Sequence, residues 1–180
     1  MDVVDALDQT FAQTHAVIAG VTPAQYGDRT PCTEWTVRDL LAHIIGVVSG
    51  LGAAAAGEAP APFELGADPT RQFDDASSAA LAAWRQPGVL DRVVEGAAGP
   101  MPGRVYASIN LLDTATHTWD LATATGQPAE LPEPVALAAL DASRMIITDA
   151  IRPGRFAPEQ PSPSGASPTL QLVAFLGRTT

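Results

Sequence analysis

The chain has 180 residues, enough for one domain over residues 1–180, and its 46% hydrophobic and 17% charged residues suit a folded core. Its net charge is −10 and its ten cations are all arginines, so we expect no nucleic acid or membrane partner, since both are bound by basic patches. The single cysteine, Cys32, excludes an internal disulfide framework, and the acidic start MDVVDALDQT is unlike a secretion signal, so we expect a cytoplasmic protein.

Two helices are predicted in the first third of the chain. Apolar residues at near-helical spacing indicate one over residues 2–19, and residues 21–35, with two prolines and a glycine, read as a loop. Thr36 followed by Asp39 has the pattern of a capping box, which predicts the start of a second helix. Its apolar stripe consists of Val37, Leu40, Leu41, Ile44, Ile45 and Val48. His43 falls to one side of that stripe.

No formal charge occurs from Leu40 to Gly57, a run long enough to raise the question of a membrane span. The run contains a histidine, a serine and four glycines, so we interpret it as a helix buried on most sides. On such a helix, His43 must satisfy its ring nitrogens either by hydrogen bonds or by a metal ion.

The rest of the chain also reads as mainly helical. A third helix is predicted over residues 70–86, and residues 89–103 suggest a short hairpin or extended crossover. Helices are then expected over residues 104–125, 132–151 and 169–177, with a proline-rich irregular stretch before the last. The helix over 132–151 is expected to bury Val135, Leu137, Leu140, Met145 and Ile146. The fold class is therefore all-α, with a short extended piece.

The predicted helix over 104–125 has two stripes at helical spacing. One is apolar, with Val105, Ile109, Leu112, Ala115, Trp119 and Ala122; the other is polar, with Tyr106, Asn110, Asp113, His117 and Asp120. Thr114, Thr118 and Thr125 are expected to meet water. The polar stripe is either a solvated surface or the wall of a site.

A metal site is the chemical interpretation of this polar stripe. Asp113 and His117 are four residues apart, so both point to one face of a helix, and His43 is the natural third ligand from a neighbouring helix. Two imidazoles and one carboxylate suit Zn²⁺, with Ni²⁺, Fe²⁺ and Mn²⁺ as alternatives. Three protein ligands leave a coordination position for water or substrate, as in catalytic sites.

The segments TPCTEWTVRDLLAHIIG and DTATHTWDLATATGQ, with the later GRFAP and LQLVAFLGR, resemble the actinobacterial branch of the DinB-like superfamily. These metal-binding proteins are related to the N-terminal domain of mycothiol-dependent maleylpyruvate isomerase. The resemblance implies a four-helix bundle with extra C-terminal helices and a divalent metal at one end, held by His43, Asp113 and His117. The isomerase has glutamate where this chain has Asp113, and the isomerase's C-terminal domain is not expected here.

The resemblance also implies a function. A small thiol of the mycothiol type would bind the metal as thiolate and attack an electrophilic substrate, in a transferase or isomerase reaction. Asp120 could orient a ligand imidazole, and the alternative is an acid on the helix surface. Asn110 and Tyr106 would line the mouth of the pocket, and for Tyr106 the favoured alternative is plain packing in the core or at the rim. The alternatives are a non-catalytic metal-binding protein acting in sensing, regulation or sequestration, and a helical scaffold without metal. The oligomeric state, monomer or homodimer, is left open.

Cys32 lies a few residues before the predicted second helix, near its positive end. That position could lower the pKa of the thiol and make it reactive or bring it near the metal. The alternative is a small buried loop residue.

Overall fold

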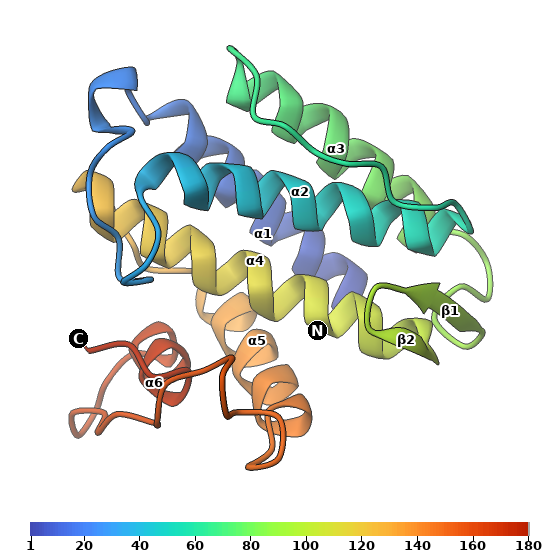
Figure 1. The fold of residues 1–180 in the computed structure, drawn as a ribbon. Coiled ribbons are helices and arrows are strands. Elements are labelled where there is room, and N and C mark those ends of the chain that lie inside the picture. The colour runs from blue at the N-terminus through green and yellow to red at the C-terminus, as the bar shows by residue number, and fades with distance from the viewer. Residues whose placement is uncertain (180) are drawn as a thin grey trace.

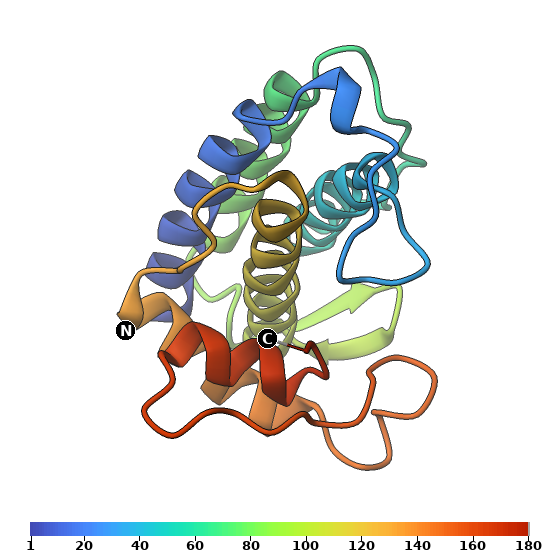
Figure 2. The same cartoon turned by 90° about the vertical axis from the view of Figure 1, so that its left-hand side faces the viewer.

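The structure, a computed structural model that describes residues 1–179, contains the predicted bundle of helices with one small hairpin (Figure 1). The elements are α1 (Val3–Ala19), a 3₁₀ turn (Pro23–Gln25), α2 (Val37–Ala56), α3 (Pro69–Trp84), β1 (Val93–Gly96), β2 (Gly99–Pro102), α4 (Gly103–Thr125), α5 (Glu133–Ile146) and α6 (Pro168–Phe175). Helices α1 to α4 form the bundle, and α5 and α6 cover its lower side (Figure 2). The all-α prediction with a hairpin at residues 89–103 is confirmed.

Helix α2 begins at the predicted capping box and packs against α3 and α4. The Thr36 hydroxyl accepts from the Asp39 N–H at 3.3 Å, and the Asp39 carboxylate accepts from the Thr36 N–H at 3.0 Å. All six residues of its predicted apolar stripe are fully buried. Gly52 permits the contact with α3, because a Cβ there would lie 2.8 Å from the Cα of Ala80. A fixed α2 start and a close α2–α3 contact together position His43.

By length and composition, α2 is also the one helix among residues 1–179 that could cross a membrane. Its apolar side chains pack against α3 and α4. This burial explains why the segment from Leu40 to Gly57 carries no charge.

Helix α4 is the central helix and is buried almost all round, because α1 and α2 pack on one side and α5 and α6 on the other. The expectation that its threonines meet water was therefore wrong for Thr114 and Thr118, which are buried. Each hydroxyl has an acceptor one turn earlier, as in the 2.7 Å bond from Thr118 to the Thr114 carbonyl. Threonine can thus lie inside the bundle without an unsatisfied hydroxyl.

Helix α5 is shorter than predicted, because it ends at Ile146 rather than at 151. Ile147 leaves the helix with φ −88° and ψ 87° and buries its own side chain. The expected burial of Leu137 and Met145 was also wrong, since these side chains are 44% and 69% exposed. The helix instead turns a face of mostly small residues inward: Val135, Ala136, Ala139, Leu140, Ala142 and Ser143.

Candidate metal centre

The structure brings the three predicted metal ligands together, His43 from α2 and the other two from α4. The Asp113 Oδ1 atom lies 3.2 Å from His43 Nε2 and 3.7 Å from His117 Nε2. One donor atom from each residue lies within 4.8 Å of the other two. Two ligands of a tetrahedral zinc ion with bonds of about 2.0–2.1 Å lie about 3.3 Å apart, so these spacings suit a metal ion after small adjustments.

The Asp113 carboxylate itself supports this fit. Its Oδ2 atom is buried and has no hydrogen-bond partner among the described residues. Burial raises the pKa of this carboxyl, but the charge of His117 and the hydrogen bond from His43 outweigh burial and hold the pKa below its usual value. A buried, ionised oxygen without a donor is costly, and a cation would compensate it. The residues present therefore fit a divalent metal.

Asp120 fixes the orientation and tautomer of His117. Its Oδ2 atom lies 2.9 Å from His117 Nδ1, and its side chain is fully buried. Burial raises the pKa of Asp120, but bonds from His117 and Arg178 lower it overall, so the carboxylate is ionised and can only accept. His117 Nδ1 must then be the donor, and in the neutral ring the lone pair is therefore on Nε2, which faces Asp113. This is the orienting contact that the sequence suggested for Asp120.

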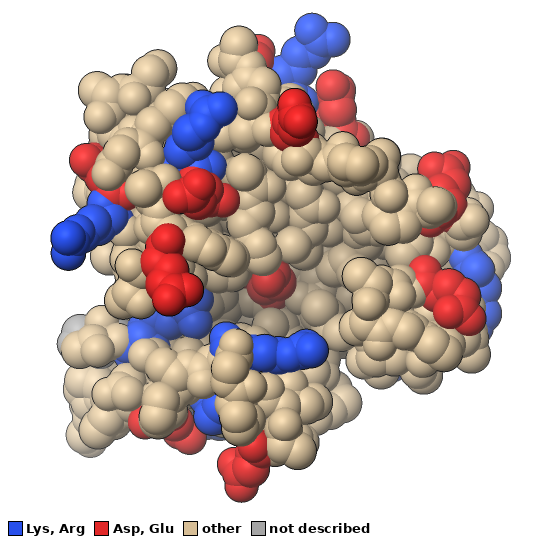
Figure 3. Space-filling model, in the orientation of Figure 1, with Lys and Arg blue, Asp and Glu red and all other residues tan. Residues whose placement is uncertain are grey.

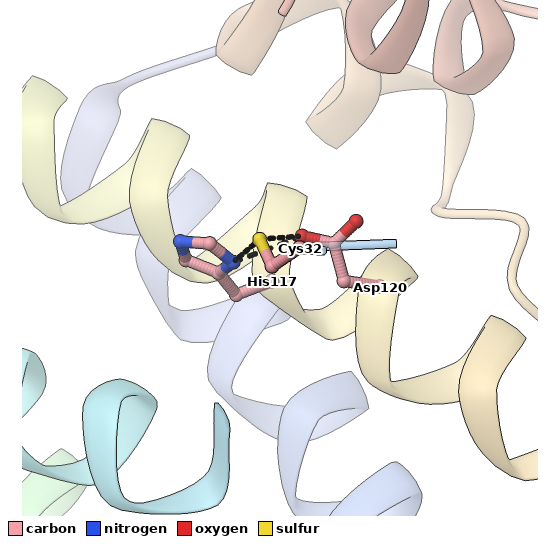
Figure 4. Close-up of side chains that lie close together, drawn as sticks. All are labelled: Cys32, His117 and Asp120. Atoms are coloured by element: carbon pink, nitrogen blue, oxygen red, sulfur yellow. Dashed lines mark hydrogen bonds and ion pairs between the residues drawn. The ribbon is translucent and has the colours of Figure 1, made fainter. Parts of the chain in front are cut away.

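The Nδ1 side of His117 holds a second cluster, shown in Figure 4, where the Cys32 sulfur lies against the His117 ring and the Asp120 carboxylate. Arg178, which follows α6, completes the cluster. Its Nη2 and Nε atoms donate to the two Asp120 oxygens at 2.7 and 3.2 Å, and Nη2 lies 3.2 Å from the Cys32 Sγ. Sequence reasoning missed Arg178, and its place in the LQLVAFLGR segment is the one signal that could have found it.

Two sets of three donors thus share His117, one on each side of its ring. The guanidinium of Arg178 already occupies the Nδ1 side. Two unit charges 4 Å apart near a protein surface repel by about 4 kcal/mol, and a divalent ion doubles that figure. On the Nε2 side, no arginine among the described residues hydrogen-bonds to Asp113 or His43, although the charge of Arg178 still reaches Asp113. Because no cation occupies the donor atoms there, this side is the better place for a metal.

Cys32 lies beside the centre but is not an activated thiol. Burial, followed by the negative charge of Asp120, raises its pKa from 9.0 to about 12, and the opposing charge of Arg178 is weaker. The idea that the start of α2 lowers this pKa was therefore wrong. At neutral pH the thiol is protonated and donates to the Asp120 carboxylate at 3.3 Å.

The three candidate ligands face a cleft of about 500 Å³. Its other walls are residues 31–35, 154–157 and 176–178. Figure 3 shows the hollow from outside, with an acidic group at its floor and basic groups along its lower rim. The ring of Trp35 lies over His43, with 4.4 Å between centroids, and 5.6 Å from the ring of His117.

Asn110 and Tyr106 are not among the residues that line this cleft. Asn110 is fully buried in α4, where it accepts from the Thr114 hydroxyl at 3.2 Å. The Tyr106 hydroxyl donates to the Gly99 carbonyl at 2.6 Å, beneath the hairpin. The structure thus does not bring these two residues to the pocket mouth, because both point into packed parts of the bundle.

Comparison with known proteins places this chain in a family. Residues 7–122 match the family described as the mycothiol maleylpyruvate isomerase N-terminal domain. The chain belongs to this family. The matched region runs from α1 to near the end of α4 and includes His43, Asp113 and His117.

Two relatives and two solved structures are also similar to this chain. Two uncharacterized proteins of Mycobacterium tuberculosis, from strains CDC 1551 / Oshkosh and H37Rv, are each 38% identical over 169 residues, which is 91% of both chains. The crystal structure of the mycothiol-dependent maleylpyruvate isomerase has a TM-score of 0.52 at 17% identity, over 78% of this chain and 68% of that chain. A histidine-to-alanine mutant of that enzyme gives 0.51 at 16% identity, with the same coverage. At these identities the likeness concerns the fold.

The family domain supplies only part of the cleft in this chain. Its matched residues provide the candidate ligands and the wall around Trp35. The opposite wall, residues 154–157 and 176–178, lies beyond residue 122 and comes from the irregular segment after α5 and the end of α6. Arg178 therefore reaches the family's helices from outside the matched domain.

Proposed function

We propose that this protein binds one divalent metal ion, preferably zinc, through His43, Asp113 and His117. We further propose that it uses the ion, in the cytoplasm, for a transferase or isomerase reaction between a small thiol of the mycothiol type and an electrophilic substrate. The observation that carries the proposal is the buried Asp113 oxygen without a donor, beside two imidazoles and open to a cleft. The family and the thiol-dependent enzyme of similar fold support the thiol.

Several residues around the centre would have separate roles in such a reaction. A bound metal supplies an acidic centre that lowers the pKa of a coordinated thiol or water and so yields a nucleophile at neutral pH. Three protein donors leave a position free toward the cleft. Asp120 keeps the His117 lone pair aimed at Asp113, and the Trp35 ring covers His43 and limits water on that side. Cys32, held as a neutral thiol, does not compete as nucleophile.

Metal content tests the first half of the proposal. Wild type should purify with about one ion per chain, and His43→Ala and His117→Ala should each lose it. His15→Ala is the matched control, because His15 is about half exposed and pairs with Asp74 away from the centre. Metal at 100 times its dissociation constant adds about 2.7 kcal/mol of stability. A chelator should therefore lower the Tm of wild type and control by roughly 5–10 °C, at about 2–4 °C per kcal/mol for a chain of this size.

The same Tm in all four proteins, with no metal in any, would overturn the metal centre. The polar stripe of α4 would then have a structural role only.

Turnover tests the second half. Conjugation or isomerisation of a panel of electrophiles should require both mycothiol and metal, and should stop after chelation. Activity that survives chelation would contradict the mechanism. Metal binding without turnover on any substrate would instead favour the sensing or sequestration role.

A further inference from the structure

The Nδ1 side of His117 has the spacing of a metal site in its own right. Cys32 Sγ lies 3.7 Å from His117 Nδ1 and 3.3 Å from Asp120 Oδ2, and the latter two atoms are 2.9 Å apart. Donors around a tetrahedral zinc ion with one sulfur ligand lie about 3.3–3.6 Å from one another. We call this set the thiol face and the set of His43, Asp113 and His117 the open face.

As a neutral ring, His117 can hold a metal ion on only one face at a time. A neutral imidazole has one lone pair, on either Nδ1 or Nε2, and a proton on the other nitrogen. Metal on the open face needs the lone pair on Nε2, whereas metal on the thiol face needs it on Nδ1. For the neutral ring the two faces are therefore alternatives, and the contacts around the ring decide between them.

Arg178 covers the thiol face. Its Nη2 lies 2.7 Å from Asp120 Oδ2 and 3.2 Å from Cys32 Sγ, so its N–H groups take the lone pairs that an ion would need. Its Nε donates to the second Asp120 oxygen at 3.2 Å, so the contact between Arg178 and Asp120 is bidentate. The side chain is only 11% exposed. Since the guanidinium is always charged, it also repels a second cation at that point.

We propose that Arg178 selects the metal-binding face of His117, by filling the thiol face so that the ion binds at the open face. This inference rests on the proposed function for the identity of the open face, whereas the thiol face is defined by its own contacts. The choice has a chemical consequence. A protein thiolate would hold a soft metal tightly and take up a coordination position, leaving less room for an external thiol.

Removal of the guanidinium should therefore create a sulfur-ligated site. Cys32 would bind as thiolate, with its proton passing to the buffer. The Nδ1 proton of His117 would leave, and its Nε2 would become the protonated nitrogen. Asp120 would give one oxygen to the ion in place of Arg178.

Cobalt substitution of the full chain reads out the face directly, because thiolate-bound Co²⁺ has a near-ultraviolet charge-transfer absorption that nitrogen and oxygen ligands lack. Wild type should bind Co²⁺ without this absorption. Arg178→Ala should gain it at about one thiolate per ion, and a Cys32→Ser change in the same variant should remove it. Arg178→Gln serves as a milder variant in case the alanine variant does not fold.

Two controls separate selection from loosening of the fold. Arg178→Lys keeps a cation on the thiol face and should show no thiolate absorption. Arg152→Ala removes bonds to the carbonyls of Ala157 and Phe175, at 2.9 and 3.0 Å, and so loosens the same segment without uncovering Cys32. It should also lack the absorption.

Each outcome decides the inference. Thiolate absorption in wild type, or its absence from folded Arg178→Ala and Arg178→Gln with Co²⁺ bound, would overturn it. If wild type binds no Co²⁺ but the Arg178 variants bind it through Cys32, Arg178 blocks the thiol face but selects no other, so the selection is refuted together with the proposed function. If wild type binds Co²⁺ without thiolate and the folded Arg178 variants do the same, the proposed metal site stands and the selection alone is refuted. If no form binds Co²⁺, both are refuted.

Discussion

Asp113 and Asp120 are the same residue type on the same helix, about two turns apart, yet their surroundings are opposite. Asp120 has both oxygens engaged, by His117, Arg178 and Cys32. Asp113 has one oxygen bonded to His43 and the other buried without a partner. Unmet hydrogen-bonding capacity, rather than burial, therefore separates these two carboxylates, and it leaves Asp113 as the one with an oxygen free to accept a ligand.

The largest expected difference is in the stability of the metal-free protein. Asp120→Asn keeps the size of the side chain but leaves the Arg178 charge buried without a counter-ion, so the free energy of unfolding should fall by about 3–5 kcal/mol. Urea denaturation in the presence of a chelator measures it. Asp74→Asn is the control, because the His15–Asp74 pair is exposed and should be worth at most about 1 kcal/mol. Equal losses in the two variants would contradict a structural role for Asp120.

Asp113→Asn should have the opposite effect to Asp120→Asn, with little change in stability but a loss of metal. The metal-free protein should change by less than about 1 kcal/mol, since the substitution removes one ordinary hydrogen bond and an unsatisfied charge. Metal content, measured by elemental analysis, should nevertheless fall to near zero, because the amide is a far weaker ligand than the carboxylate. If Asp113→Asn retained its metal while losing several kcal/mol of stability, the roles assigned to the two carboxylates would be exchanged.

A third difference concerns the thiol on the Asp120 side. The pKa of Cys32 is raised from 9.0 to about 12, so its neutral form favours the folded state. That contribution is complete below pH 9 and is lost as the pH rises from 9 towards 12. The difference in stability between metal-free wild type and Cys32→Ser should shrink over this range. Iodoacetamide should alkylate Cys32 slowly at pH 8 in the folded protein and quickly in urea. Rapid alkylation of the folded protein would contradict the raised pKa.

The sequence was informative wherever the determinant was local. The Thr36–Asp39 capping box and the apolar stripe of α2 set where His43 stands, and a spacing of four put Asp113 and His117 on one face. These features depend on helical geometry alone, so they can be read from a few neighbouring residues.

The rest depends on contacts between distant parts of the chain. Arg178 and Asp120 are 58 residues apart in the sequence, and no periodic pattern predicts a contact over such a separation. The burial of Thr114 and Thr118 and the exposure of Leu137 and Met145 follow from how α5 and α6 cover α4, which the apolar pattern of each helix does not specify. The grouping of His43, Asp113 and His117 could thus be predicted from the sequence, whereas the second wall of the cleft could not.

The separation of 58 residues also has a meaning for biosynthesis. The ribosome makes the chain from its N-terminus, so Arg178 is added 58 residues after Asp120. Until then the guanidinium that covers Cys32 and Asp120 does not exist. The thiol face can therefore be covered only after the segment that follows α6 has been made.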